Sequence, residues 1–215
     1  AVYARRFWVL FVLSLVSCQQ SCLWLTYSPV EDEAKALFGW SSSSIDFFAF
    51  WGPATYVPCV LFAPWIVDRM GLRAAVTLSA LLSCAAACIR CVTTAAPWAL
   101  ALAHVSCILN SLAGPFVLAT PSKLAALWFA PTERTTACAA AMMANFLGSA
   151  VGFLVALPVK STAQLQHLLL LEAAASVAIL LLAAADHCWP PLPPLPPSVS
   201  AAIAHAASGS AAPAP

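Results

Sequence analysis

Residues 7–27 read FWVLFVLSLVSCQQSCLWLTY, an almost continuous apolar run that follows Arg5 and Arg6. A helix needs about 20 apolar residues to cross the roughly 30 Å hydrocarbon core of a bilayer, and this run has that length. A signal peptide would have a shorter apolar region, of about 7 to 15 residues. We therefore interpret residues 7–27 as a membrane-spanning helix.

Five further stretches of the same kind follow. They are residues 44–67, 72–91, 97–118, 136–157 and 165–185. Only 8% of the 215 residues are charged, whereas a soluble domain carries about 25%. The net charge of +1 also argues against nucleic acid as a partner, because phosphate binding needs clustered Lys and Arg. We expect an all-α membrane protein, with a bundle of six transmembrane helices in residues 1–187.

The basic residues predict an orientation, because Lys and Arg are enriched in cytoplasmic loops. If the N-terminus is cytoplasmic, six basic residues fall on the cytoplasmic side and three on the other side. The six are Arg5, Arg6, Arg69, Arg73, Lys123 and Arg134, and the three are Lys35, Arg90 and Lys160. We therefore expect both ends of the six-helix unit to face the cytoplasm.

Residues 188–215 differ in composition from the rest of the chain. They begin CWPPLPPLPP and continue mainly in Ala, Ser and Pro. Proline fixes φ and has no backbone N–H to donate, so this stretch cannot continue a helix. We expect a disordered, Pro/Ala-rich cytoplasmic tail or linker, with a ligand for a proline-reading domain as the alternative.

The first predicted span carries a polar stripe. Ser17, Gln20, Trp24 and Tyr27 follow an i, i+3, i+7, i+10 pattern and therefore share one helix face. Polar groups in hydrocarbon need partners or a water-filled cavity, so this face should turn toward the bundle or a substrate path. Gln20, Trp24 and Tyr27 are candidate substrate-binding residues, and a Trp ring can stack on a cationic solute. The alternative is an interfacial Trp and Tyr belt with structural glutamines.

Two titratable side chains lie inside predicted spans: His104 in residues 97–118 and Glu172 in residues 165–185. Ionisable groups in a membrane are costly, and each of these can change its charge, so proton coupling is the functional hypothesis. The alternatives are a neutral, hydrogen-bonded histidine and a carboxylate that packs helices together. Asn110 is a further candidate for substrate binding. It lies about 120° around the helix from His104, so the two should not point into one cavity.

Small residues and prolines predict helix packing and helix bends. Asn145, Gly148 and Gly152 share a stripe of residues 136–157, which favours close packing of two helices over a binding site. The pairs Gly52-Pro53 and Gly114-Pro115 are positions where their spans are expected to break or bend.

The cysteines predict packing and no metal site. Cys88 and Cys91 have the spacing of a metal-binding pair, but no second pair or His pair completes a zinc set. No motif of a hydrolase, a nucleotide-binding loop or a paired-carboxylate site is found either. We therefore expect neither an enzyme nor a cofactor.

Two loops carry a resemblance to a known superfamily. DRMGLR at residues 68–73 resembles the G-x-x-x-D-R-x-G-R-R loop that follows the second span in the major facilitator superfamily, although Pro64 and Leu72 depart from that pattern. WFAPTER at residues 128–134 resembles the W-F-x-x-x-E-R segment after the fourth span. The resemblance implies loops that take part in conformational change. Their residues are Asp68, Arg69, Gly71, Arg73, Glu133 and Arg134.

Together with RFWVL at residues 6–10, NSLAGP at 110–115 and GSAVGFL at 148–154, these segments look like solute carrier family 49, the feline leukaemia virus subgroup C receptor-related transporters. The WGP at residues 51–53, Glu172 and the proline-rich tail look most like its disrupted-in-renal-carcinoma protein 2 branch. In that family, a tryptophan that matches Trp24 contacts a cationic substrate.

The resemblance implies secondary-active, proton-linked transport of a small organic solute, either a pyridoxine-like vitamin or another small cationic metabolite. It implies the N-terminal half of the superfamily fold, in the lysosomal membrane or alternatively the plasma membrane. The expected partners are the lipid bilayer, the solute, protons and the missing C-terminal six-helix half. The alternative is a truncated, non-transporting six-helix protein that acts as a binding or assembly partner.

Overall fold

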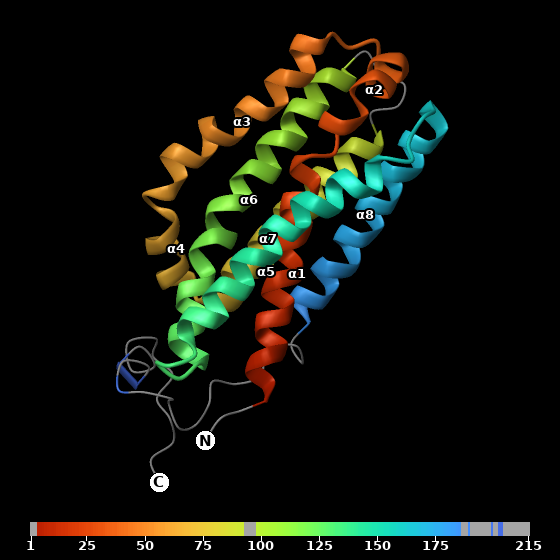
Figure 1. Cartoon of the computed structure of the whole chain (residues 1–215). Helices are drawn as coiled ribbons and strands as arrows, with labels where there is room; N and C mark the ends of the chain where they lie inside the picture. The colour runs from red at the N-terminus through yellow and green to blue at the C-terminus, as the bar shows by residue number, and fades with distance from the viewer. Residues whose placement is uncertain (1–3, 93–97, 186–188, 190–198, 200–201, 204–215) are drawn as a thin grey trace.

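The computed structural model describes residues 4–92, 98–185, 189, 199 and 202–203 (Figure 1). The part of the chain that it describes contains no strand, so the all-α fold class is confirmed. The elements are α1 (Arg5–Trp24), the 3₁₀ turn η1 (Ser28–Val30), α2 (Glu31–Phe38), α3 (Ser42–Val60), α4 (Ala63–Met70), α5 (Leu72–Val92), α6 (Ala99–Trp128), α7 (Arg134–Ala156) and α8 (Thr162–Ala184).

Among the described residues, up to six segments can span a membrane. Five helical segments are each long and apolar enough, and α3 with α4 makes a sixth that is bent by 63°. The bend comes after Val60, because α4 restarts at Ala63 with Pro64 in its first turn, where the missing N–H of proline costs no hydrogen bond. The chain is therefore an integral membrane protein with one broken span.

The pairs Gly52-Pro53 and Gly114-Pro115 do not break their helices, since α3 and α6 run through both pairs. Helix α6 also ends at Trp128 instead of residue 118, so it passes Pro121 and places Lys123 on a helix instead of in a loop. Pro121 cannot donate to the carbonyl of Val117 four residues earlier. The hydroxyl of Thr120 donates to that carbonyl instead, at 2.8 Å, which lets the helix continue.

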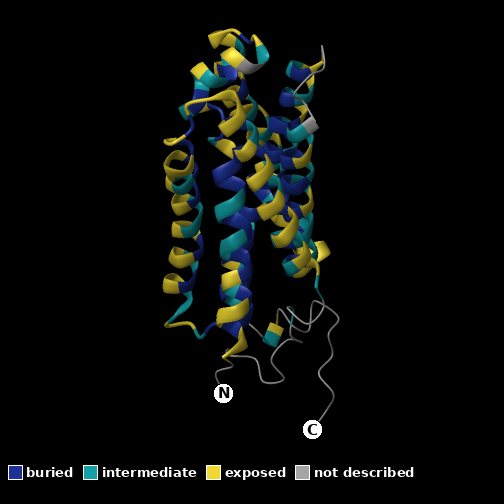
Figure 2. Ribbon diagram, turned by 90° about the vertical axis from the view of Figure 1, so that its right-hand side faces the viewer, coloured by how far each residue is buried: buried dark blue, intermediate teal, exposed yellow. Residues whose placement is uncertain are grey.

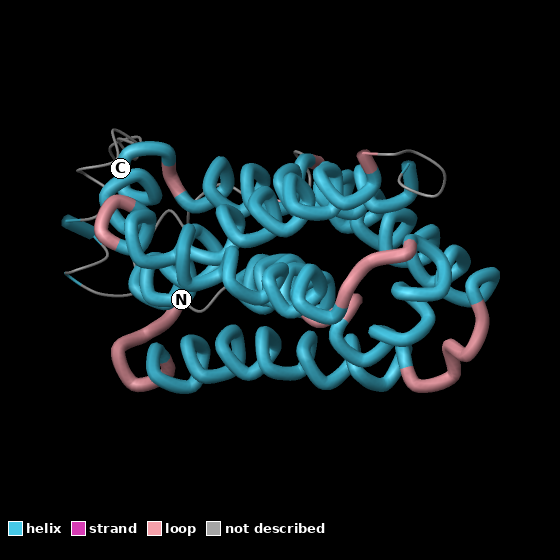
Figure 3. The backbone as a smooth tube through the Cα atoms, turned by 90° about the horizontal axis from the view of Figure 1, so that it is seen from above, coloured by secondary structure: helices cyan, strands magenta, loops and turns pink. Residues whose placement is uncertain are grey.

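Helix α1 lies at the centre of the bundle, where it contacts α5, α6, α7 and α8 (Figure 1). Most of the connecting loops gather at the two ends of the bundle (Figure 3). Exposed residues, yellow in Figure 2, lie mainly on the outward faces of the helices. The inner face of α1 forms one core with α5 and α6, through the buried side chains Val9, Val12, Leu13, Val16, Val76 and Leu124.

Helices α1 and α7 pack closely because two glycines of α7 have no side chain. A Cβ added at Gly148 would lie 2.0 Å from the carbonyl oxygen of Cys18, and one added at Gly152 would lie 3.0 Å from that of Cys22. The packing role expected for this stripe is therefore confirmed. It brings the backbone of α7 directly against that of α1.

The first residue of α1 and the last residue of α8 lie at the same end of the bundle, together with the α4–α5 and α6–α7 turns (Figure 1). At this end, Arg73 donates from Nη2 to the carbonyl oxygen of Ala184 at 3.0 Å. The tail expected in residues 188–215 lies outside the described residues, apart from Trp189, Val199, Ala202 and Ile203.

The α1–α7 contact predicts a graded effect of alanine substitution. Gly148→Ala should lower the melting temperature of the detergent-purified protein more than Gly152→Ala, because its Cβ meets backbone at the shorter distance. Overpacking costs about 1–3 kcal/mol, which outweighs the roughly 1 kcal/mol that alanine gains over glycine in a helix. The exposed Leu147, changed to Ala, is the control on the same helix. A Gly148→Ala variant as stable as the wild type would contradict the close contact.

Candidate functional site

A pocket of about 480 Å³ lies between α1, α3, α6 and α7. Its lining contains no charged side chain. The residues that line it are Gln20, Ser21, Trp24, Gly52, Pro53, Tyr56, Val57, Ser111, Gly114, Leu118 and Asn145. It therefore combines aromatic surface with neutral polar groups, as small-molecule sites commonly do.

The indole of Trp24 rests on α3 at Gly52. A Cβ added at Gly52 would lie 1.6 Å from Cη2 of Trp24, so any other residue at this position would displace the ring. Trp24 is 36% exposed and Tyr56 is 37% exposed, although both are large aromatic residues that line the pocket. Exposed aromatic faces of this kind can bind a cation.

The amide of Gln20 is held by the neighbouring helix α6. Its Nε2 donates to the backbone oxygen of Asn110 at 3.1 Å, and Nδ2 of Asn110 donates back to the backbone oxygen of Gln20 at 3.1 Å. On the side of α7, Oε1 of Gln20 accepts a hydrogen bond from Nδ2 of Asn145 at 3.5 Å. Gln20 and Asn145 both line the pocket, and an amide oxygen has a second lone pair that can accept another hydrogen bond.

The structure separates the four residues expected to bind substrate. Gln20 and Trp24 line the pocket, whereas Asn110 lies behind Gln20 and Tyr27 lies outside the lining. Tyr27 is 4% exposed and packs against Trp40 and Phe48 at ring distances of 5.7 and 5.5 Å. It belongs to a second core, formed by α2, α3, α6 and α8 around the α1–α2 connection.

Sequence reasoning did not predict that α3 forms a wall of the pocket. It also did not predict that Ser111 lines the pocket. Gly52 and Pro53 were read as signals of a break or bend, a feature that transporters also use at binding sites, and Asn145 was read as a packing residue. The exposed aromatic Tyr56 in an apolar run had no pattern that singled it out. A pocket wall formed by a glycine, which has no side chain, can be recognised only once the position of the facing helix is known.

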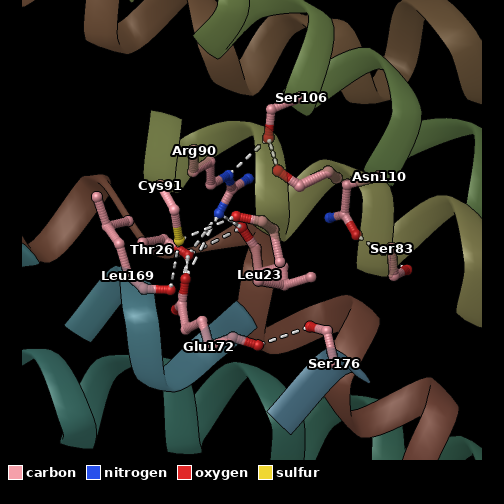
Figure 4. A network of polar contacts seen from close by, with 12 residues as sticks. Leu23, Thr26, Ser83, Arg90, Cys91, Ser106, Asn110, Leu169, Glu172 and Ser176 are labelled. Atoms are coloured by element: carbon pink, nitrogen blue, oxygen red, sulfur yellow. Dashed lines mark hydrogen bonds and ion pairs between the residues drawn. The ribbon is translucent and has the colours of Figure 1, made fainter. Parts of the chain in front are cut away.

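A buried ion pair joins α5 to α8 (Figure 4). Nη1 of Arg90 lies 3.8 Å from a carboxylate oxygen of Glu172, and both side chains are almost fully buried. Thr26, just after α1, donates its hydroxyl to Glu172 at 2.8 Å and accepts from Arg90 at 2.7 Å. Arg90 also donates to the backbone oxygen of Leu23 at 2.8 Å and to Ser106 of α6 at 2.7 Å. The network therefore fixes the end of α1 that carries Trp24.

Arg90, which was counted among the basic residues of the non-cytoplasmic side, is 1% exposed and lies inside the bundle near the end of α5. The signal in the sequence for this burial was a cation within the otherwise apolar run ACIRCV at residues 87–92. Intramembrane charges usually pair with one another, so Glu172 in another predicted span was its natural partner.

His104 lies on α6, apart from the pocket lining, and faces α3. Its Nδ1 accepts a hydrogen bond from Nε1 of Trp51 at 2.9 Å. Its ring contacts those of Phe47 and Phe48 at centroid distances of 5.8 and 4.9 Å. His104 and Asn110 therefore face different helices, in agreement with their angular separation.

The loop residues cluster at the end of the bundle where α1 begins. Asp68 forms an ion pair of 3.1 Å with Lys123, and Arg69 lies 4.6 Å from the ring centre of Trp65. Arg134 donates to the backbone oxygens of Ala126 and Phe129 at the end of α6. Gly71 has a φ of +85°, which favours glycine at the α4–α5 turn.

Glu133 connects the start of α7 to the start of α1. Its carboxylate accepts two hydrogen bonds from the guanidinium of Arg6, one of them at 3.1 Å. The hydrogen bond from Arg6 lowers the pKa of Glu133 below its usual value. Arg6 in turn lies 4.7 and 4.9 Å from the ring centres of Phe7 and Phe129. This cluster closes one end of the α1–α7 contact.

Comparison of the sequence with known protein families agrees with these features: the pocket, the broken span and the charged turns at one end of the bundle. A family model of the Major Facilitator Superfamily matches residues 9–212. The chain belongs to the major facilitator superfamily. The superfamily resemblance seen in the two charged loops is therefore confirmed, and the chain is a member of a transporter superfamily.

The curated relatives belong to solute carrier family 49, as the sequence resemblance implied. The solute carrier family 49 member 4 homolog of Xenopus tropicalis is 35% identical over 218 residues, which cover 94% of this chain and 48% of that protein. The choline/ethanolamine transporter FLVCR1 of Felis catus is 37% identical over 157 residues, covering 72% and 28%. FLVCR2 of Homo sapiens, also named a choline/ethanolamine transporter, is 32% identical over 154 residues, covering 72% and 29%. The chain thus spans about half the length of the family 49 member 4 homolog.

The Arg90–Glu172 pair predicts non-additive destabilisation. Arg90→Leu or Glu172→Leu alone should cost about 3–5 kcal/mol, because each leaves a buried charge without its partner. The double variant should be more stable than either single variant, since no charge remains. Thermal melting of the purified proteins measures all four states of this cycle. A double variant that loses the sum of the single effects would show that the two charges do not interact.

The Arg6–Glu133 pair predicts a pH-dependent contribution to stability. Because the folded pKa of Glu133 is lowered, the contribution is complete above the ordinary Glu value of about 4.3 and is lost as the pH falls through the folded pKa. Glu133→Gln should therefore lower the melting temperature near neutral pH but not at a pH below the folded pKa of Glu133. Glu33→Gln, on α2 at the opposite end, is the control. An equal effect of Glu133→Gln at both pH values would contradict the ion pair.

Proposed function

We propose that this chain is one six-helix half of a secondary-active transporter for a small organic cation, and that the pocket beside Trp24 is its part of the substrate site. The observation that carries the proposal is the seating of the Trp24 indole on Gly52, which leaves an aromatic face at an uncharged pocket. Relatives of the chain are named choline/ethanolamine transporters, and choline and ethanolamine are both small cations.

The chemistry of the lining favours a cation over an anion. A buried anion would need a Lys or Arg partner, and the lining contains neither. A quaternary or primary ammonium gains roughly 0.5–2 kcal/mol from an aromatic face. Oε1 of Gln20 adds a neutral acceptor for a donor group on the same solute. The solutes we propose are choline, ethanolamine and pyridoxine-like molecules.

Apolar side chains are exposed on the helices at both sides of the pocket, and they support a second six-helix half as the partner of this chain. Helix α3 exposes Phe50 and Val57, and α7 exposes Met143, Phe146 and Leu154. Major facilitator proteins move two halves about a site near the membrane midplane, and the family 49 member 4 homolog is about twice as long as this chain. In the complete transporter, we expect these faces to contact the second half, with the remaining apolar surface in contact with lipid.

Proton linkage is part of this proposal, with Glu172 and His104 as the candidate groups. Glu172 is held by Arg90 and Thr26, so its charge has a buried counter-ion. His104 forms its hydrogen bond with a neutral indole. The same resemblance that implies proton linkage supports a lysosomal membrane, with the plasma membrane as alternative. The distribution of Lys and Arg supports an orientation in which both termini of the six-helix unit face the cytoplasm.

Uptake by a chimera tests the proposed site. The segment of the Xenopus tropicalis relative that aligns with this chain is replaced by this chain, and uptake of labelled choline, ethanolamine and pyridoxine into proteoliposomes is measured. Trp24→Ala should lower uptake of the transported solute about tenfold, because the aromatic contact is lost. Trp98→Ala removes a tryptophan that is 67% exposed and lies outside the pocket lining, and should leave uptake unchanged.

Each other outcome of this experiment contradicts one part of the proposal. Equal uptake by Trp24→Ala and the parent chimera would remove Trp24 from the site. A chimera that inserts into the membrane but takes up none of the three solutes would favour the non-transporting assembly protein. Glu172→Gln in the same chimera should reduce the pH dependence of uptake if Glu172 carries the proton, and an unchanged pH profile would exclude it.

A further inference from the structure

The hydrogen bond between Trp51 and His104 requires a neutral imidazole. The indole Nε1–H can only donate, so Nδ1 of His104, at 2.9 Å, must be the acceptor. The ring proton then resides on Nε2. A protonated imidazole has a hydrogen on both nitrogens, and two N–H groups would face each other across this contact. Protonation of His104 therefore breaks the hydrogen bond.

This contact lies next to the seat of Trp24. Trp51 directly precedes Gly52, on which the Trp24 indole rests. The pocket wall that follows consists of Pro53, Tyr56 and Val57 of the same helix α3. A movement of α3 away from α6 at Trp51 would therefore displace the surface that positions Trp24.

Helix α3 is held to the bundle by few buried side chains. Among its described residues, only Ile45, Phe48 and Gly52 are buried. Phe48 packs against the His104 ring at 4.9 Å, and Phe47 packs against it at 5.8 Å. His104 is thus the centre of the contact that holds this part of α3 against α6.

The titratable groups around His104 have other partners or lie exposed. Asp46 of α3 is exposed, and the thiol of Cys107 on α6 faces Arg90 of α5. Arg90 also lies 5.1 Å from the ring centre of Tyr27, whose ring contacts Phe48. In α2, Lys35 pairs with Glu31 and Asp32. Among the described residues, no ion pair fixes the charge of His104 in advance.

We propose that Trp51 and His104 form a latch between α3 and α6 that opens when His104 is protonated, and that His104 is therefore a positioning residue for Trp24. With the latch closed, α3 supports the indole at the pocket. With the latch open, α3 is free to separate from α6, and Trp24 loses its support. The effect on the substrate rests on the proposed function of the pocket, whereas the latch itself does not.

The expected size follows from the loss of one hydrogen bond. Such a bond is worth roughly a two- to tenfold change in an equilibrium. Imidazole is the side-chain group that serves for charge changes between a pH of about 5 and about 8, so choline affinity is compared at a pH of about 7.5 and at about 5. Choline affinity should accordingly be two- to tenfold weaker at a pH of about 5 than at about 7.5.

Nuclear magnetic resonance of the indole N–H tests the latch directly. The protein is labelled with ¹⁵N-tryptophan in nanodiscs, and the signal that disappears in Trp51→Phe is assigned to Trp51. This signal should move as the pH falls from about 7.5 to about 5. In His104→Asn, which keeps an acceptor oxygen near the Nδ1 position but cannot be protonated, it should stay in place. A signal that does not titrate in the wild type, or that titrates equally in His104→Asn, overturns the latch.

If His104→Asn does not fold, a second measurement on the wild type still tests the latch. The imidazole of His104, identified by its cross-peak with the Trp51 indole N–H, should titrate with the same midpoint as that indole. Different midpoints overturn the proposal.

Choline titration of the same samples separates the latch from the proposed function. Trp51→Phe should bind choline with the weaker, low-pH affinity at both pH values, and His104→Asn with the stronger, high-pH affinity at both. If choline binds to none of the proteins while the indole titrates as expected, the substrate proposal fails and the latch stands. If the wild type binds choline with the same affinity at both pH values, the positioning role of His104 fails.

Discussion

The ion pair between Arg90 and Glu172 is the interaction on which the position of α1 depends. A cation and a carboxylate can be buried in a membrane bundle only if each satisfies the other. Here Thr26 and the backbone oxygen of Leu23 complete the set, so the network holds the last turn of α1 from both α5 and α8 (Figure 4). Trp24 lies between Leu23 and Thr26 in the chain. The charge pair therefore fixes the aromatic residue of the pocket without touching the pocket.

Two close approaches then shape the space beside α1. Gly148 lets α7 reach the backbone of α1, and Gly52 lets the Trp24 indole lie on α3. Helices α3 and α7 thus both approach α1, and the pocket is the space left between these three helices and α6. The function we propose depends on this placement of α3 and α7, because neither helix contributes a charged side chain to the pocket lining.

Sequence reasoning reached the spans and part of the pocket for physical reasons that are local. The length of an apolar run predicts a span, and the polar stripe of α1 predicted that Gln20 and Trp24 face inward. The burial of Arg90 was not predicted, because the depth of a charge near a helix end depends on the neighbouring helices. The end of α6 was placed too early because the hydroxyl of Thr120 compensates for Pro121. The pocket wall at Gly52 could not be predicted from the sequence, since it depends on the Trp24 ring, which belongs to a different helix.

The most direct measurement of the central claim is the position of a bound cation. A diazirine derivative of choline is photo-crosslinked to the protein in nanodiscs, and the modified residues are mapped by mass spectrometry. If the pocket is the substrate site, the label is found on Trp24, Tyr56 or their neighbours in the lining, and excess choline prevents it. Labelling confined to lipid-facing residues, or labelling of the pocket that excess choline does not reduce, would contradict this account.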